Sequence, residues 1–274
     1  MNILITGGNG FIARNLYKAL RQKHDVLLTN RKSLDVLDQE AVSSFLNTNS
    51  VDIVVHTAVS GGRRTRQDSM QTVIENLKMF NNFVFNKHKF DAFIHFGSGA
   101  EFDRRTDISL AEEEDSSPID YYGLSKLIIK REITRLKCFY NLRIFGCFGK
   151  DEEETRFIKS ATRKIREGKP ITIHKNRNMD FISIEDLCTV VEYYVDNFDI
   201  KELPKDINLC YTEKVSLLDV ANKLNALAGK PLNNVVIQEP GLGNEYTGSP
   251  NKLENLRLNL LGLDKSLKKI MRKG

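Results

Sequence analysis

The sequence predicts an α/β protein that consists of a doubly wound parallel sheet followed by a smaller C-terminal subdomain. Two observations predict this fold class. Short apolar runs alternate with amphipathic helical patterns through residues 1–150, as expected when helices cover both faces of a parallel sheet. In addition, a glycine-rich turn, TGGNG, joins the first apolar run directly to the first helical pattern.

Strands and helices are expected to alternate from the N-terminus onwards. Apolar runs such as NILIT and VDIVVH are continuous, and apolar residues recur at helical spacing between these runs. Strands are expected over residues 2–6, 25–29, 51–56, 91–96 and 141–145. Helices are expected over residues 11–20, 39–46, 70–86 and 121–136.

The pattern changes after residue 149, where an acidic loop leads into a basic helix. Glycine and proline are frequent over residues 240–250, so the last segment is expected to be rich in loops. Further elements are expected at 156–167 (helix), 171–174 (strand), 181–184 (strand) and 190–195 (helix). The predicted division is a first domain of residues 1–150, to which 179–210 return, and a smaller subdomain of 151–178 and 211–274.

Composition excludes several classes of protein. With 41% hydrophobic and 28% charged residues among 274, the chain has the composition of an ordinary soluble globular protein. No apolar stretch approaches the roughly 18 residues of a membrane-spanning helix, and the first residues do not resemble a signal peptide. A cytoplasmic protein without a membrane partner is therefore expected. The four cysteines lack metal-binding spacing, so neither a metal site nor a disulfide framework is expected.

The net charge, 41 − 36 = +5, suits an anionic small molecule. Because the basic residues are mostly scattered and accompany no recognition motif, no nucleic-acid partner is expected.

The glycine-rich turn is the first candidate binding site. Glycines between a first strand and a first helix permit a tight turn and let backbone amides approach a pyrophosphate at the helix N-terminus. We therefore expect Gly7, Gly10, Phe11 and Ile12 to contact a dinucleotide. A purely structural turn is the alternative.

The end of the second strand indicates which dinucleotide is bound. Proteins that bind NAD usually place a carboxylate there, whereas this chain has Asn30, Arg31 and Lys32. Two cations at this position suit a 2′-phosphate, so the predicted cofactor is NADP(H). A solvated basic turn is the alternative. Asp38 is expected to reach the adenine amino group.

Three further residues form a candidate catalytic set. Tyr122 and Lys126 lie one helical turn apart on one helix face, and Ser98 follows the strand DAFIHF at the sheet edge where ligands bind. A free tyrosine has a pKa near 10, which a neighbouring lysine cation and an oxidised nicotinamide would lower. Ser98 would hydrogen-bond the reacting oxygen, within reach of the phenol and of the nicotinamide.

The turn TGGNGFIA, Ser98 and the Tyr122–Lys126 pair, in this order, resemble the extended short-chain dehydrogenase/reductase family. Its nucleotide-sugar epimerases, dehydratases and reductases look most similar. The segments HTAV, LRIFGCFG and MDFISIEDL extend the resemblance over almost the whole chain, and Asn76 stands where the family often has a fourth residue of the catalytic network.

The resemblance implies a Rossmann fold and a C-terminal subdomain that binds a nucleotide-sugar. It also implies a homodimer formed by two helices of each subunit. By the same resemblance, the cofactor would be contacted by Thr57, Ala58 and Val59.

Within the family, residues 30–38 and the surroundings of Ser98 look most like GDP-fucose synthase and related NADPH-dependent 4-keto-sugar reductases. Gly99 and Ala100 replace the Asp-Glu pair of the 4,6-dehydratases, so the elimination of water is not expected. Ala100 and Arg156 also replace the cysteine and histidine that epimerise carbons 3 and 5. Epimerisation of carbons 3 and 5 is therefore not expected either.

Substrate contacts are less well defined by the sequence. Glu101 is either a contact with a substrate hydroxyl or a structural residue. Arg177 lies two positions before the arginine that relatives place on the pyrophosphate, and Gly146 replaces an asparagine that often touches the sugar. Tyr246 either lines the nucleotide pocket or belongs to a plain loop.

The leading hypothesis is therefore an NADPH-dependent reductase of a nucleotide-activated 4-keto-6-deoxy sugar, in which Tyr122 donates the proton. One alternative is a nucleotide-sugar 4-epimerase with retained NAD(P). Another is a non-catalytic NADP-binding regulatory protein, against which the complete Ser98, Tyr122 and Lys126 set argues.

Overall fold

The computed structural model describes residues 1–63, 67–108, 118–200, 203–231 and 234–272, which form two compact units. The first unit contains Met1–Asp103, Glu114–Arg143 and Cys188–Ile207. The second contains Arg104–Glu113, Ile144–Leu187 and Asn208–Gly274. The segment that returns to the first unit is thus shorter than the expected 179–210.

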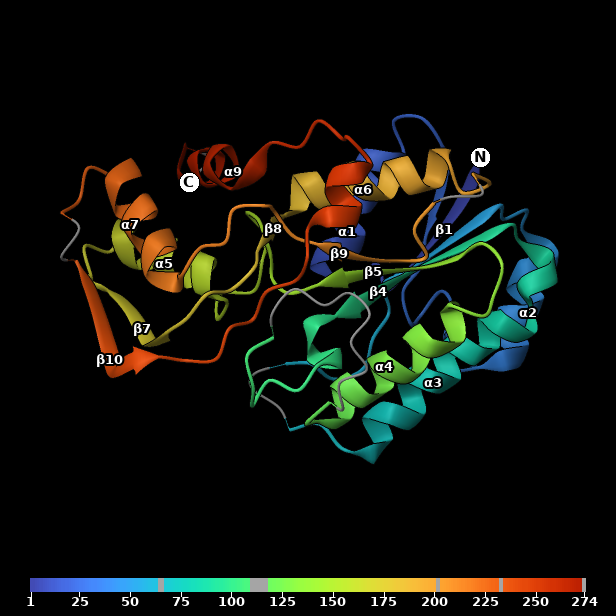
Figure 1. Ribbon diagram of the computed structural model, residues 1–274. Helices are drawn as coiled ribbons and strands as arrows, with labels where there is room; N and C mark the ends of the chain where they lie inside the picture. Colours follow the sequence, from blue (N-terminus) through green and yellow to red (C-terminus); the bar gives the residue numbers. More distant parts are fainter. Residues whose placement is uncertain (64–66, 109–117, 201–202, 232–233, 273–274) are drawn as a thin grey trace. The chain divides into compact units, whose positions relative to one another are not determined.

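A six-stranded parallel sheet dominates the first unit (Figure 1). The predicted parallel sheet is confirmed, and Asp206–Leu209 adds a sixth strand that was not expected. Its strand order is β2-β1-β3-β4-β5-β9, so the chain runs outwards from β1 to β2 and then crosses to β3 on the other side of β1. In such sheets ligands bind beyond the carboxyl ends of the strands where this reversal occurs. The strands are β1 (Asn2–Thr6), β2 (Asp25–Leu28), β3 (Ile53–His56), β4 (Ala92–Ser98), β5 (Phe139–Ile144) and β9 (Asp206–Leu209).

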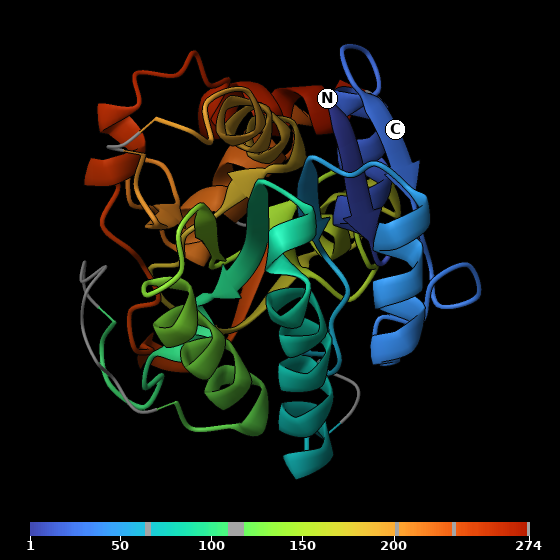
Figure 2. The same ribbon diagram turned by 90° about the vertical axis from the view of Figure 1, so that its right-hand side faces the viewer.

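Helices connect these strands and bury their apolar sides against the sheet. They are α1 (Phe11–Leu20), α2 (Gln39–Thr48), α3 (Met70–Phe85), α4 (Tyr121–Ile133) and α6 (Ile184–Asp196). α3 and α4 run side by side in both views (Figures 1 and 2). Their apolar residues meet the sheet in an aromatic core, where Phe80 and Phe83 of α3 contact Phe93 of β4 at ring-centroid distances of 5.8 and 5.6 Å.

The second unit has its own apolar core and contains more regular structure than the sequence indicates. The core is formed mainly by residues of α5, α7, α9 and β7. The elements are β6 (Cys147–Phe148), α5 (Phe157–Arg166), β7 (Ile171–Asn176), β8 (Ile182–Ser183), α7 (Leu217–Leu227), β10 (Val235–Leu242), α8 (Asn251–Asn255) and α9 (Gly262–Arg272).

Two differences from the expected elements have clear physical causes. The run FISI forms only the short strand β8, because the Ser183 hydroxyl accepts the amide N–H of Asp186 at 3.1 Å and starts α6 there. The lysine-rich C-terminal segment forms α9, because Leu263 and Leu267 lie one turn apart and are buried in the second core. Among the described residues, no helix has the length and apolarity needed to cross a membrane.

Candidate active site

The glycine turn lies between β1 and α1 and is packed tightly against the segment that follows β3. Gly7 has φ of +70°, and a Cβ atom on it would lie 2.8 Å from the backbone nitrogen of Ala58. Its carbonyl accepts the N–H of Gly10 at 2.8 Å, which closes the turn. Both the conformation and the close contact therefore require glycine at position 7.

The N-terminus of α1 has the character of an anion site. Its N-cap residue, Gly10, has an extended backbone and no side-chain cap hydrogen bond, and the first turn contains no acidic residue. The first N–H groups of the helix, at Phe11 and Ile12, therefore point out of the helix end, and no acidic residue of the first turn competes for them. This arrangement fits the pyrophosphate of a dinucleotide.

The segment after β3 is anchored to the end of β1. The Thr57 hydroxyl donates to the carbonyl of Thr6 at 2.6 Å, and the Thr6 hydroxyl accepts the N–H of Ala58 at 3.2 Å. Val59 follows and is exposed. The expected cofactor residues of this segment thus lie beside the glycine turn.

The turn after β2 presents two cations to solvent. The Asn30 carboxamide oxygen accepts the N–H groups of Lys32 and Ser33, which fixes the turn. The Arg31 side chain is 78% exposed and pairs with Asp35, Nε to Oδ2, at 3.2 Å. Its guanidinium thus remains accessible to a 2′-phosphate.

Asp38, which was expected near the adenine, is the N-cap of α2. One of its carboxylate oxygens accepts the N–H groups of Glu40 and Ala41. The structure thus shows a capping role for this side chain.

Ser98 is the last residue of β4 and begins the single helical turn η2 (Gly99–Glu101). Its hydroxyl oxygen accepts the N–H of Ala100 at 3.1 Å. Because a hydroxyl has one proton to donate, this acceptor bond leaves the proton available for a ligand oxygen.

Helix α4 brings the phenol and the ammonium to the same strand end. α4 begins at Tyr121, where Asp120 caps it by accepting the N–H of Gly123 at 2.6 Å. A Cβ atom on Gly123 would overlap the carbonyl oxygen of Ala100, so the helix lies directly on η2. Tyr122 therefore lies next to the turn that begins with Ser98.

Lys126 is buried beneath this strand end. Its Nζ atom donates to the carbonyl oxygen of Phe96 at 2.7 Å and lies 5.7 Å from the centre of the Tyr122 ring. Burial lowers the pKa of Lys126 to about 8, although the negative charge of Glu101 opposes this shift. The ammonium thus lies near the Tyr122 ring and loses its proton at a lower pH than an exposed lysine does.

The two histidines near the site lie within the sheet. Burial and, secondarily, the charge of Lys126 lower the pKa of His56 to about 3, and they lower the pKa of His95 as well. Both imidazoles are therefore neutral near pH 7. His56 shares a hydrogen bond with the Thr6 hydroxyl at 3.0 Å, and His95 lies 3.4 Å from the Lys126 nitrogen.

Asn76 of α3 connects the loop that contains Ser60 to α4. Its carboxamide bonds the backbone of Ser60 in both directions and donates to the Ser125 hydroxyl at 2.9 Å. Ser125 in turn donates to the carbonyl of Tyr122 at 2.7 Å. The role of Ser125 is missed in the sequence, since a serine inside a helix carries no signal of its partner.

The other candidate substrate contacts are Glu101, Arg177 and Tyr246. Glu101 is 1% exposed and hydrogen-bonds Arg143. Arg177 and Tyr246 both belong to the second unit. The Tyr246 backbone pairs with Asn178, and its ring meets that of Phe145 at 5.2 Å.

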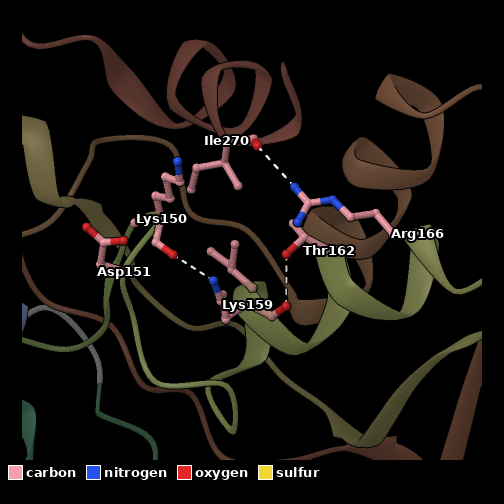
Figure 3. A pocket seen from close by; sticks show the side chains of 8 residues that line it. Lys150, Asp151, Lys159, Thr162, Arg166 and Ile270 are labelled. Carbon is pink, nitrogen blue, oxygen red and sulfur yellow. Dashed lines mark hydrogen bonds between the residues drawn. The ribbon is translucent and has the colours of Figure 1, made fainter. Parts of the chain in front are cut away.

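A separate pocket of about 160 Å³ lies in the second unit and contains none of the predicted site residues (Figure 3). Lys159 donates to the carbonyl oxygen of Lys150 at 2.6 Å, and Arg166 is directed at the carbonyl oxygen of Ile270. Both cations thus already contact carbonyl oxygens of the chain. The residues that line this pocket do not include the predicted catalytic serine, tyrosine and lysine.

Comparisons with known proteins show the family of the chain and its fold. The sequence profile of the NAD dependent epimerase/dehydratase family matches residues 3–210. GDP-6-deoxy-D-talose 4-dehydrogenase of Aggregatibacter actinomycetemcomitans is 24% identical, covering 96% of this chain and 92% of that protein. GDP-L-colitose synthase of Yersinia pseudotuberculosis is 23% identical, covering 76% of each chain.

A solved structure similar in fold is the GDP-mannoheptose C4 reductase of Campylobacter jejuni with NADP bound. It superimposes with a TM-score of 0.83 at 21% sequence identity, covering 99% of this chain and 97% of that one.

Proposed function

Because the chain belongs to the NAD dependent epimerase/dehydratase family, we propose that this oxidoreductase reduces the C4 keto group of a nucleotide-activated 4-keto-6-deoxy sugar with NADPH. The observation that carries the proposal is the docking of α4 on η2 through Gly123 and Ala100. It brings Tyr122 and Lys126 to the strand end that holds Ser98. Carbonyl reduction needs this combination of a proton donor, a cation and a hydrogen-bond donor.

The cofactor proposal rests on the two turns that follow β1 and β2. The uncapped N-terminus of α1 would hold the pyrophosphate, and Arg31 with Lys32 would hold the 2′-phosphate. When bound, NADPH supplies the hydride. The absence of a carboxylate at the end of β2 favours NADPH over NADH.

Three side chains have separate roles in the reduction. The Ser98 hydroxyl, whose oxygen accepts the Ala100 N–H, donates its proton in a hydrogen bond to the C4 oxygen. Tyr122 transfers its phenolic proton to that oxygen. Lys126 binds the ribose of the cofactor and stabilises the phenolate that remains, because its charge lies close to the Tyr122 ring.

The residues after Ser98 argue against the elimination of water. Gly99 and Ala100 occupy the two positions that follow the serine, and neither side chain can accept or donate a proton. The site therefore has no acid–base pair there for eliminating water.

The second unit would bind the nucleotide-sugar through Arg177 and Tyr246. The names of the three similar proteins described above contain GDP, so GDP-linked sugars come first among the candidate substrates.

A homodimer is part of the proposal, and an apolar face of α3 supports it. Met70, Ile74 and Phe85 on this helix are 51%, 52% and 64% exposed, which is unusual for large apolar side chains on one element. A second copy of the chain would cover this face. Light scattering is expected to give a dimer for the wild type and a monomer for Ile74→Glu.

The test of the reaction is to incubate the protein with NADPH and a panel of nucleotide 4-keto-6-deoxy sugars linked to GDP, dTDP, UDP or CDP, with NADH in parallel. We expect stoichiometric loss of reduced-nicotinamide absorbance with one substrate and a much slower loss with NADH. Cofactor binding without oxidation on any member would contradict the reductase. Conversion of a 4-hydroxy nucleotide-sugar into its C4 epimer, with bound NAD(P)+ reduced and then reoxidised in each cycle, would then favour the 4-epimerase. Binding with neither reaction would favour a regulatory NADP-binding protein.

A further inference from the structure

A buried charge network lies directly behind the strand end that holds Ser98. Glu101 accepts the backbone N–H of Ser98 through Oε1 at 2.9 Å. Its other oxygen, Oε2, accepts the Nε–H of Arg143 at 2.9 Å. Arg143 also donates through Nη2 to both carboxylate oxygens of Asp206, at 2.9 and 2.7 Å. The network therefore runs from β9 through β5 to the end of β4.

From this network we infer that Glu101 is a positioning residue, which fixes Ser98 for hydrogen bonding to the substrate and is itself fixed by Arg143 and Asp206. The inference rests on the proposed function, since it assigns the hydrogen-bond donor of that site. It also distinguishes between the two roles left open for Glu101. Burial favours the structural role, because a carboxylate that is 1% exposed offers almost no surface to a substrate hydroxyl and both of its oxygens already accept hydrogen bonds within the protein.

Ser98 and Glu101 hold each other in a reciprocal arrangement. The carboxylate accepts the Ser98 N–H, while the Ser98 hydroxyl accepts the N–H of Ala100 within the same turn. Fixing the backbone at Ser98 also fixes the direction of its Cα–Cβ bond, and the Ala100 bond then fixes the hydroxyl oxygen. The hydroxyl proton is the only part of the side chain left to respond to a ligand.

The sequence makes room for this carboxylate at Gly97. A Cβ atom there would overlap the Oε1 atom of Glu101 and would lie 2.6 Å from the carboxamide atoms of Asn141. Asn141 itself donates to Asp206 at 2.8 Å, so it holds the far end of the network. The run GSGAE is therefore adapted to place a carboxylate under the strand end.

The charges of the network are better suited to orienting Ser98 than to stabilising the fold. Two buried carboxylates share one guanidinium, and burial raises the pKa of Glu101 although the charge of Arg143 opposes the rise. Buried ion pairs of this kind often stabilise a fold no better than apolar residues of the same volume. Their directional hydrogen bonds, however, specify one geometry, and that geometry includes the Ser98 backbone.

The test is the variant Glu101→Gln, which keeps the size of the side chain but has one acceptor oxygen. Ser98 N–H and Arg143 both donate, so one of them must face the amide NH2 group. With the substrate identified in the panel, kcat is expected to fall about 10- to 100-fold, the effect of displacing a catalytic group by about 1 Å. Glu101→Gln also removes a negative charge that raises the pKa of Lys126, so the dissociation constant for NADPH is measured at about pH 6, well below that pKa. There it is expected to stay within about twofold, because the network does not touch the cofactor turns. The matched control, Glu132→Gln on the exposed surface of α4, is expected to leave kcat unchanged.

A double-variant cycle separates positioning from a general effect on the fold. If Glu101 acts through Ser98, the pair Ser98→Ala and Glu101→Gln will have the same kcat as Ser98→Ala alone. If the two losses of kcat multiply in the double variant, the inference is wrong. It is also wrong if Glu101→Gln keeps the wild-type kcat. Gly97→Ala, which displaces the carboxylate without changing any charge, provides the same cycle if Glu101→Gln does not fold.

A crystallographic comparison tests the inference even if no substrate is found and the proposed function fails. In crystals of the protein with NADPH, the Ser98 hydroxyl is expected to leave the Ala100 N–H in Glu101→Gln and to keep it in the Glu132→Gln control. An unchanged Ser98 in Glu101→Gln would overturn the inference, independently of any reaction.

Discussion

A Cβ atom on Gly62 would lie 2.9 Å from both Cε2 and Cζ of Tyr122, so the backbone of Gly62 is packed against the ring edge that carries the phenolic hydroxyl. Gly62→Ala is therefore expected to push the phenol out of place. We expect kcat to fall at least about tenfold while NADPH affinity changes little, since the ring must shift by a few tenths of an ångström or more. Single-turnover kinetics with saturating NADPH measure this effect.

Gly168→Ala is the matched control for backbone strain. Gly168 has nearly the same φ as Gly62, +69° against +72°, but no atom lies within 4 Å of its hypothetical Cβ. The control is expected to lose stability only. An equal loss of kcat in both variants would mean that Gly62 does not act through contact with the phenol.

Gly123→Ala is expected to destabilise the first unit. The added Cβ would overlap the Ala100 carbonyl oxygen, which is backbone and cannot move aside cheaply. A loss of about 3 kcal/mol, at the upper end of the range for overpacking, should appear in urea denaturation. In Gly243→Ala the new Cβ would meet its nearest neighbour at 3.6 Å, so no comparable loss is expected there.

Most of the first unit could be predicted from the sequence because its strands and helices as far as β5 each have a periodic signal, whereas the four-residue strand β9 was not expected. β1 and α1 match the expected residues 2–6 and 11–20, and the parallel sheet follows from buried, continuously apolar strands. α7, α8, α9 and β10 are not among the expected elements. The signal of β10 is interrupted by Pro240 and Gly241, and α8 has only five residues. The sequence of α7, LLDVANKLNAL, does have apolar residues at helical spacing, so the expectation of a loop-rich segment overlooks a helical signal.

The site could be predicted only in part, for a related reason. Ser98, Tyr122 and Lys126 occur at recognisable positions relative to a strand and a helix. The contact of Gly62 with Tyr122 joins residues about 60 positions apart, and the pairing of Glu101 with Arg143 about 40, and no local pattern encodes either contact. Such contacts depend on how the sheet places its strand ends.

Tyr122→Phe removes the proton donor and leaves the ring in place. Turnover is expected to fall by about 10²- to 10⁴-fold, the contribution of a positioned general acid. Binding of NADPH should persist, because the ring still packs against Gly62. The measurement is a single-turnover rate beside a fluorescence titration with NADPH, and near-wild-type turnover would refute the proposed mechanism.

The activity is expected to depend on pH through Lys126. Burial lowers the pKa of this group to about 8, so the side chain is a cation below that pH and neutral above it. If the cation binds the cofactor ribose, kcat/KM for NADPH is level below pH 8 and falls towards tenfold per unit above it. In Lys126→Arg the guanidinium stays charged, so its residual kcat/KM should lack this alkaline decline. A decline near pH 8 in both proteins would assign it to another group.

Arg31→Ala tests how NADPH is distinguished from NADH. A charge-assisted contact with the 2′-phosphate contributes about 1.5–3 kcal/mol, so the dissociation constant for NADPH is expected to rise roughly 10- to 100-fold. NADH lacks that phosphate, and its affinity should not change. Arg135→Ala is a close control, because Arg135 is 75% exposed against 78% for Arg31 and also pairs with a nearby carboxylate. Equal weakening of both cofactors in Arg31→Ala would show that Arg31 contacts a part they share, and the preference would then have to arise elsewhere.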